Sequence, residues 1–187
     1  MSLAAPSALH ADALALLRGW RSPDEGQERV RRTYVDHLER NPDGLFRHNY
    51  PDHITASTLV VSADRERVLL TLHAKARAWF QFGGHCEDRD VTLEDAALRE
   101  AVEESGVPDL LIDPEPVQLN PHEVPFCDPR GGVRHLDVRF VATAAPTAEH
   151  TVSEESLDVA WWPVHALPNG DADLHELVRL ALARLGD

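Results

Sequence analysis

Glu100, Glu103 and Glu104 lie close together near the middle of this 187-residue chain. If they are helical, at about 100° per residue, they occupy an arc of about 100°, with Leu98 and Val102 near the opposite side. Like charges within one helical turn repel each other by about 0.2–0.5 kcal/mol per pair. The acidic edge therefore favours a bound cation. Mg²⁺ suits it, because Mg²⁺ accepts a few carboxylates together with waters and substrate phosphates.

Arg99 and the pair Gly83-Gly84 extend this candidate site. Arg99 precedes Glu103 by one helical turn and is expected to fix its side chain. The two glycines allow a close backbone approach and offer a carbonyl oxygen as a further ligand. These residues predict a divalent-metal site built from carboxylates and one backbone carbonyl.

The helix that must carry the glutamates has clear ends in the sequence. Thr92 followed by Asp95 is a capping-box pattern, and Gly106 followed by Pro108 is a stop signal. The predicted helix therefore spans Leu93 to Ser105.

The spacing of these residues resembles the signature box of the Nudix hydrolases, the MutT-like pyrophosphohydrolases. The box reads G-x5-E-x7-R-E-U-x-E-E-x-G-U, with U aliphatic, and the matching residues are Gly84, Arg99 to Glu104, Gly106 and Val107. The resemblance implies an α/β/α sandwich with a mixed sheet. It also implies metal-dependent cleavage of the pyrophosphate bond in a nucleoside diphosphate linked to another moiety.

The resemblance assigns roles to individual residues. Glu100, Glu103, Glu104 and the carbonyl of Gly83 would bind Mg²⁺ or Mn²⁺, and Arg99 would orient the acidic cluster. Glu103 and Glu104 are also candidates for catalysis, because one carboxylate must take a proton from the attacking water.

The loop before the helix departs from the family pattern. Fourteen residues separate Gly84 from Arg99, one more than the pattern has. The first glutamate of the box then corresponds to Asp90 when counted from the glycine, or to Val91 when counted from the arginine. Asp90 is the chemically sensible match.

Other candidates lie outside the box. Glu155, next to Glu154 and just before the last strand, is the favoured general base outside the helix, and an ordinary polar turn is the alternative. Lys75 and Arg77 are candidates for contact with a distal phosphate, although an isolated basic pair in a loop is more often a solvated turn.

Alternation in the strand after Gly131-Gly132 also predicts substrate contacts. It places His135, Asp137 and Arg139 on a polar face and Leu136 on the packed face. His135 and Asp137 are therefore candidate substrate-binding residues.

A zinc site is not expected from the cysteine and histidine spacing. The candidate ligands include no C-x2-C pair, and the separation of the two cysteines fits no standard ligand pattern. The residues considered are His85, Cys86, His122, Cys127 and His135.

Composition narrows the choice of partners and compartment. The formal charge of −14 disfavours general nucleic-acid binding. Two cysteines without a signal-peptide pattern favour a reducing cytoplasm, and the absence of a run of about 18 apolar residues excludes a membrane span. A homodimer is expected only as the commonest form of oligomer.

Residues 1–50 are expected to form a helical extension. Ser7 is a candidate N-cap of the first helix. The second helix is expected to start with Ser22 as N-cap and Pro23 in its first turn, and to stop at Asn41-Pro42.

Residues 51–187 are expected to form a single α/β domain that closes with a helix over Asp171 to Leu185. The expected strands span residues 55–62, 67–72, 79–82, 117–124, 133–143 and 157–162.

Two other functions are compatible with the same box. One is a module that binds nucleotide ligands as a sensor without cleaving them, although binding alone does not need Arg99 and all three glutamates. The other is an isoprenoid-diphosphate isomerase of the same fold, whose carbon-directed acid and base are not found in the sequence.

Overall fold

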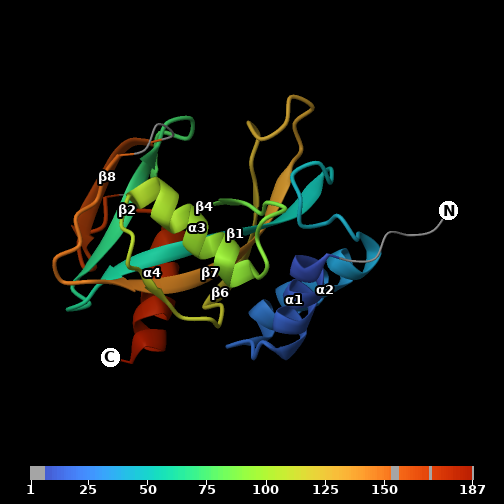
Figure 1. The fold of residues 1–187 in the computed structure, drawn as a ribbon, viewed down its shortest axis with the longest axis horizontal. Helices are drawn as coiled ribbons and strands as arrows, with labels where there is room; N and C mark the ends of the chain where they lie inside the picture. The colour runs from blue at the N-terminus through green and yellow to red at the C-terminus, as the bar shows by residue number, and fades with distance from the viewer. Residues whose placement is uncertain (1–6, 153–155, 169, 187) are drawn as a thin grey trace.

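A mixed β-sheet with helices on both faces forms the centre of the protein (Figure 1). The computed structural model describes residues 7–152, 156–168 and 170–186. The strands are β1 (Asp52–Ser62), β2 (Arg67–His73), β3 (Trp79–Phe80), β4 (Phe82–His85), β5 (Leu111–Ile112), β6 (Gln118–Glu123), β7 (Arg134–Ala144) and β8 (Ser156–Pro163). The helices are α1 (Ala8–Gly19), α2 (Glu25–Arg40), α3 (Leu93–Ser105) and α4 (Ala172–Leu185). The predicted α/β sandwich with a mixed sheet is confirmed.

Strand β1 is the centre of the sheet. It runs parallel to β7 over its whole length, from Asp52 opposite Arg134 to Ser62 opposite Ala144. Antiparallel partners cover its other edge, β4 near its start and β2 near its end. The remaining order is β3-β2-β1-β7-β5, with β6 paired to β7 and β8 paired to β2.

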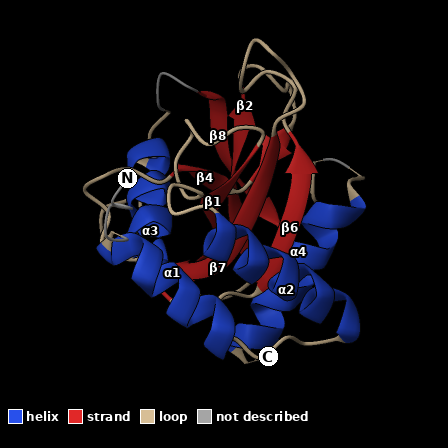
Figure 2. Ribbon diagram, turned by 90° about the vertical axis from the view of Figure 1, so that its right-hand side faces the viewer, coloured by secondary structure: helices blue, strands red, loops and turns tan. Residues whose placement is uncertain are grey.

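The two faces of β1 pack against different helices, as Figure 2 shows. Ile54 and Ala56 contribute to the core beneath α1, α2 and α3, whereas Leu59 and Val61 pack against α4. Because both faces are covered, nearly the whole strand is buried. The apolar stripe predicted for the last helix supplies the α4 side of this second core, through Leu174, Leu177, Val178 and Ala181.

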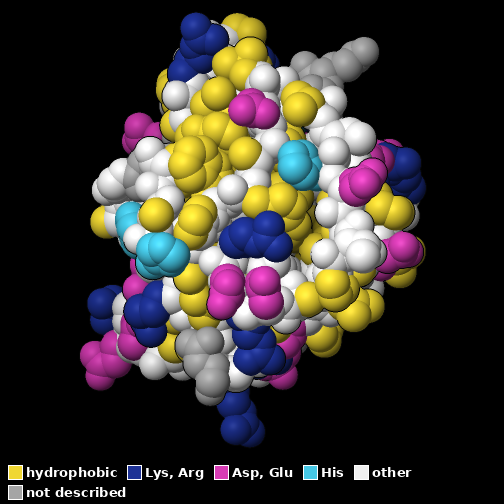
Figure 3. Space-filling model, turned by 90° about the vertical axis from the view of Figure 1, so that its left-hand side faces the viewer, with side chains coloured by type: hydrophobic (Ala, Val, Ile, Leu, Met, Phe, Trp, Pro, Cys, Tyr) yellow, Lys and Arg dark blue, Asp and Glu magenta, His cyan; other side chains and the backbone are white. Residues whose placement is uncertain are grey.

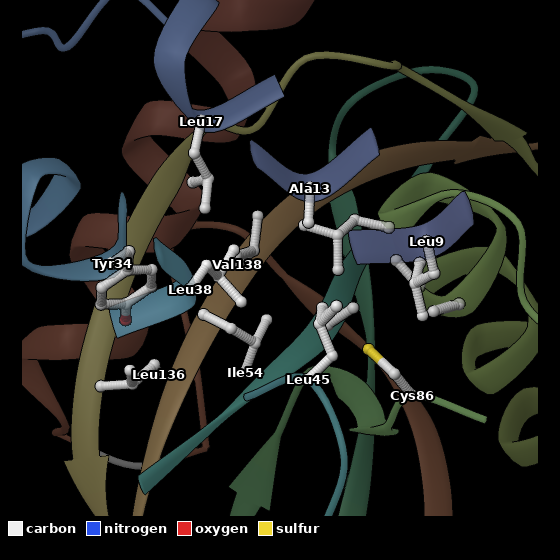
Figure 4. Packing of buried hydrophobic residues seen from close by; sticks show 14 of the residues in the cluster. Leu9, Ala13, Leu17, Tyr34, Leu38, Leu45, Ile54, Cys86, Leu136 and Val138 are labelled. Carbon is white, nitrogen blue, oxygen red and sulfur yellow. The ribbon is translucent and has the colours of Figure 1, made fainter. Parts of the chain in front are cut away.

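The N-terminal helices share one core with the sheet. In Figure 4, Leu17, Tyr34 and Leu38 lie beside Ile54 and Val138 of the central strands. The Tyr34 hydroxyl also donates a hydrogen bond to the Asp137 carbonyl, at 3.2 Å. Residues 1–50 and residues 51–187 therefore share a core. The expected division into a helical extension and a separate domain stays a prediction.

Most predicted element boundaries match the structure, and α3 does so at both ends. The start of α2 was predicted wrongly. Asp24, not Ser22, is its N-cap and accepts a hydrogen bond from the backbone N–H of Gln27 at 2.9 Å. Ser22 instead donates to Glu28 at 2.9 Å, so Pro23 lies before the helix. An aspartate caps as well as a serine, and here the serine has another partner.

Two features of the sheet differ from the prediction. The strand expected over residues 79–82 is divided into β3 and β4, and β4 continues through the glycines of the box to His85. The short edge strand β5 was not predicted. In the part of the chain that the structure describes, none of the helices has the length and apolar character to cross a membrane.

Candidate active site

A cavity of about 1100 Å³ opens between the acidic edge of α3 and one face of the sheet. Box residues, sheet residues and two loops form its wall. From the box come Gly83, Gly84, His85, Glu87, Arg99, Glu100, Glu103 and Glu104; the sheet contributes Thr55, Ser57, His135, Asp137 and Arg139, among others. The glutamates singled out in the sequence therefore face a space that can hold a ligand.

Helix α3 holds the glutamates at this wall. Both hydrogen bonds of the predicted capping box are present between Thr92 and Asp95, at 2.9 and 3.1 Å. Gly106 ends the helix with a left-handed backbone, φ 70°, which favours glycine. On the buried side, the carbonyl of Ala97 accepts a hydrogen bond from Thr58 of β1 at 3.0 Å. The helix is thus fixed at its ends and along its packed face.

Arg99 is the centre of the site's hydrogen bonds. Its guanidinium donates to both carboxylate oxygens of Asp90, at 2.9 and 3.0 Å. It also donates to Glu100 at 2.9 Å and to Glu103 at 3.2 Å. A further bond, of 3.0 Å, reaches the backbone carbonyl of His85. Arg99 therefore connects the helix, the preceding loop and the end of β4, which agrees with the orienting role expected for it.

Asp90 is the buried partner of this arginine, with 3% of its side chain exposed. One of its oxygens also accepts the backbone N–H of Glu87 at 2.7 Å. Burial raises the pKa of Asp90, but the hydrogen bonds from Arg99 and Glu87 outweigh this effect, and the pKa lies below its ordinary value. The match of Asp90 to the box is therefore structurally sensible despite the extra residue.

The three glutamates differ in their surroundings. Glu103 is half exposed and also accepts a hydrogen bond from Arg89 at 2.8 Å, whereas 16% of the Glu100 side chain is exposed. Glu104 lines the same cavity. Their carboxylates and the adjacent Gly83 backbone are hard oxygen donors, which suit Mg²⁺ or Mn²⁺.

The glycine pair leaves the space that this arrangement needs. A Cβ added at Gly84 would lie 2.7 Å from a carboxylate oxygen of Glu100. A Cβ at Gly83 would lie 2.3 Å from the Cβ of Ser57 on the paired strand β1. Gly84 therefore makes room for a candidate ligand, and Gly83 makes room for strand pairing.

The two glycines are expected to respond differently to alanine. Gly84→Ala should displace the Glu100 carboxylate and lower kcat/KM by about 10²-fold with little loss of stability, since misplacing a reacting group by about 1 Å has effects of this size. Gly83→Ala should instead lower the free energy of unfolding by about 1–3 kcal/mol through overpacking. Steady-state kinetics and urea unfolding distinguish the two effects. Gly19→Ala is the control, because no atom of another described residue that could clash lies within 4 Å of its added Cβ. Equal behaviour of the two variants would contradict this interpretation.

Asp137 and Arg139 form a buried pair on the cavity side of the sheet. Asp137 accepts hydrogen bonds from Thr55 at 3.0 Å, Ser57 at 2.7 Å and Arg139 at 3.1 Å. Burial raises the pKa of Asp137, but the positive charge of Arg139 outweighs this effect and lowers it. Alternation placed both residues on the polar face correctly, and the structure shows that the Asp137 carboxylate is engaged by protein donors.

The remaining candidates lie in different places. Lys75 and His135 line the cavity, whereas Arg77 is not among its lining residues in the part of the chain that the structure describes. Arg77 has a left-handed backbone, φ 58°, in the turn between β2 and β3. Glu155, the proposed base outside the helix, lies outside the described residues.

A group of three histidines and a cysteine lies at one end of the same sheet face. Ligand atoms of His53, His85, Cys127 and His135 all lie within 4.8 Å of one another. Burial, with the neighbouring histidines, lowers the pKa of His85 to about 4 and that of His135 to about 3. Among the described residues, this is the one group of His, Cys, Asp and Glu side chains whose ligand atoms all lie this close together. The three glutamates of the box do not form such a group.

Sequence reasoning missed this group. It named His85, Cys127 and His135 but not His53, and it judged the spacing unsuitable. The missing signal is strand pairing, because His53 lies directly opposite His135 in the parallel pair β1 and β7. No local sequence pattern encodes that pairing.

Comparison with known proteins agrees with the fold and the box. A family model described as the NUDIX domain matches residues 51–181. None of the curated proteins compared with the chain matches it.

Solved structures with the same fold include three enzymes from different organisms. A NUDIX-family hydrolase from Clostridium perfringens is 24% identical, with a TM-score of 0.54 over 68% of this chain and 97% of that one. An Ap4A hydrolase from C. elegans is 18% identical, with a TM-score of 0.59 over 71% and 96%. The dihydroneopterin triphosphate pyrophosphohydrolase of E. coli is 17% identical, with a TM-score of 0.56 over 70% and 95%. At these identities the structures show the fold, and with the family match they establish that the chain belongs to the Nudix family.

Proposed function

We propose that this protein is a Mg²⁺- or Mn²⁺-dependent pyrophosphohydrolase that cleaves a nucleoside diphosphate linked to another moiety. The observation that carries the proposal is the Arg99 network. One largely buried guanidinium holds Glu100 and Glu103 at the cavity wall and is itself fixed by Asp90. A helix face that was merely solvated would not need such support.

Glu100, Glu103, Glu104 and the Gly83 carbonyl would hold the metal. Bound there, a divalent ion supplies charge neutralisation for the pyrophosphate oxygens and lowers the pKa of water. The chain's own contribution is to fix the carboxylates through Arg99 and to position the diphosphate against them. A carboxylate must also accept the proton of the attacking water, and Glu103, Glu104 and Glu155 remain the proposed candidates.

Substrate contacts would come from other residues that line the cavity. Lys75 provides a cation for a phosphate beyond the scissile bond, and Phe126, whose ring lies 5.6 Å from that of His73, offers an apolar surface for a base. Asp137 is proposed to act through its neighbours, because it fixes Ser57, Thr55 and Arg139. These features suit a nucleotide derivative, in line with the substrate named for the Ap4A hydrolase.

Surface charge supports a small-molecule substrate. On the face shown in Figure 3, lysine and arginine side chains are scattered among acidic and apolar ones. With a net charge of −14, this pattern supports the expectation that the protein does not bind nucleic acid in general. Cys86 and Cys127 are not joined by a disulfide, which supports the proposed cytoplasmic location. Homodimerisation stays a prediction.

A substrate panel tests the proposed function. Nucleotide sugars, ADP-ribose, dinucleoside polyphosphates and nucleoside triphosphates are incubated with the protein, and release of nucleoside monophosphate or phosphate is measured. Activity is expected with added Mg²⁺ or Mn²⁺ and should disappear when these ions are omitted. Omission is preferable to a chelator, because a chelator can remove other metals as well.

The outcomes separate the alternatives. Binding of nucleotides without any product would support the sensor function and contradict hydrolysis. Conversion of an isoprenoid diphosphate without phosphate release would support the isomerase. Activity that does not depend on added Mg²⁺ or Mn²⁺ would contradict the proposed role of the glutamates.

A further inference from the structure

We propose that His53, His85, Cys127 and His135 bind one structural zinc ion, separate from the metal site of the box glutamates. The group draws its members from four parts of the fold: β1, the end of β4, the loop between β6 and β7, and the start of β7. Three imidazole nitrogens and one thiolate are a ligand set that zinc prefers.

The distances to the sulfur fit a tetrahedral ion. The Sγ of Cys127 lies 3.5 Å from the Nε2 of His85 and 3.4 Å from the Nε2 of His135. In a tetrahedral site, Zn–S and Zn–N bonds of about 2.3 and 2.0–2.1 Å place sulfur and nitrogen about 3.5 Å apart. The remaining ligand atoms lie within 4.8 Å of one another, so binding needs them to close by at most about 1.5 Å.

The three rings surround one point. The ring centroids of His53 and His85 are 5.1 Å apart, and each of these rings lies 5.0 Å from the ring of His135. Neutral imidazoles packed this closely bring together nitrogen lone pairs that few donors can reach. A bound cation satisfies them together, which gives the cluster a physical reason to exist.

His53 provides an independent indication that a ligand belongs here. The residue is 1% exposed, and its Nε2 is buried without a hydrogen-bond partner among the residues that the structure describes. Its Nδ1 lies 3.2 Å from the backbone carbonyl of Asn49, to which it donates when protonated. This bond selects the tautomer with a free lone pair on Nε2, as outer-shell partners of metal-binding histidines commonly do.

The rest of the surroundings suits a structural ion. Four protein ligands leave no open position for water, which is typical of structural zinc and unlike catalytic zinc. Arg47 also donates to the backbone carbonyl of Cys127 at 2.7 Å and so holds the loop in place. The ion would join this loop to His85, whose own carbonyl accepts the hydrogen bond from Arg99. The inference does not depend on the proposed hydrolase activity.

Elemental analysis of the full-length protein tests the site directly. The protein is produced without a polyhistidine tag, and its metal content is measured. One zinc per chain is expected in the wild-type protein. The zinc content of Cys127→Ser and of His135→Ala should each be at least about tenfold lower. Cys86→Ala and His122→Ala are matched controls that should keep it. Cys86 is next to His85 but packs into the apolar core in Figure 4, and the ring of His122 contacts that of His135 without belonging to the group.

Two further measurements keep the test decisive if a variant fails to fold. Reconstitution of the wild-type protein with Co²⁺ should give tetrahedral d–d bands and a thiolate-to-cobalt charge-transfer band. Chelation of zinc should lower the melting temperature by roughly 5–10 °C.

Several results would overturn the proposal. These are a folded protein that contains no zinc and shows no thiolate band with Co²⁺, a different metal in the same stoichiometry, or retention of zinc by both Cys127→Ser and His135→Ala. Glu103→Gln should keep its zinc, so failure of the hydrolase assignment and failure of the zinc site give different results.

Discussion

Replacement of Glu103 by glutamine is expected to lower kcat/KM by at least about 10²-fold while the protein stays folded. The change keeps the size of the side chain and removes its negative charge, which the site needs to hold a divalent ion and to stabilise the reacting phosphates. Loss of a single electrostatic group at an active site commonly has an effect of this size. Half of the Glu103 side chain is exposed, so the cost in stability should be small. Steady-state kinetics with Mg²⁺ and the best substrate of the panel measure the effect.

Glu94→Gln is the matched control for this variant. Glu94 lies in the first turn of the same helix α3 and is not among the described residues that line the cavity. The same chemical change there should leave kcat/KM within about twofold of the wild-type value. A charge at a helix N-terminus contributes to helix stability, not to the reaction, and only by about 0.3–1 kcal/mol. Unchanged turnover in Glu103→Gln, or an equal loss in both variants, would show that the box glutamates are not the site of the reaction.

Arg99→Ala is expected to lower the free energy of unfolding by about 3 kcal/mol. Asp90 has 3% of its side chain exposed, and removal of Arg99 leaves this carboxylate buried without its cationic partner. Breaking a buried ion pair in this way costs about 3–5 kcal/mol, and the lower end applies because 12% of the Arg99 side chain is exposed. Urea unfolding followed by circular dichroism gives the value.

Two further variants serve as comparisons for the loss of stability expected in Arg99→Ala. Arg179→Ala on α4 also removes an arginine from an ion pair, but both partners are exposed, so a much smaller loss is expected. Arg99→Lys should recover only part of the stability, since lysine cannot bond Asp90 with two parallel donors and also reach Glu100. An Arg99→Ala protein no less stable than Arg179→Ala would disprove the supporting role of this network.

The Arg99–Asp90 pair also gives the site a defined dependence on pH. The pKa of Asp90 lies below its ordinary value in the folded protein. Its contribution to stability is therefore present above the unfolded-state pKa, near 3.9, and is lost as the pH falls through the lower folded-state value. The network is expected to stay intact at neutral and mildly acidic pH.

The sequence alone determined helix α3 and the box that it carries. The reason is that the relevant interactions are local. The capping box joins Thr92 to Asp95, Gly106 ends the helix, and the helical repeat places the three glutamates on one edge. The alternation that put Asp137 on a polar face is local in the same way. The start of α2 was the exception, because Ser22 and Asp24 are both good caps and a side-chain contact decided between them.

The tertiary structure alone decided which distant residues meet. The ion pair between Asp90 and Arg99 depends on how the loop before α3 folds back on the helix, and it supports Asp90 over Val91 as the match to the box. The histidine and cysteine group depends on the parallel pairing of β1 with β7, which sets His53 opposite His135, and on a loop that brings Cys127 to them. Strand pairing and loop closure depend on the burial of both faces of β1 by α1 to α4, which is a property of the whole chain. For this reason no spacing within the sequence could have predicted the group.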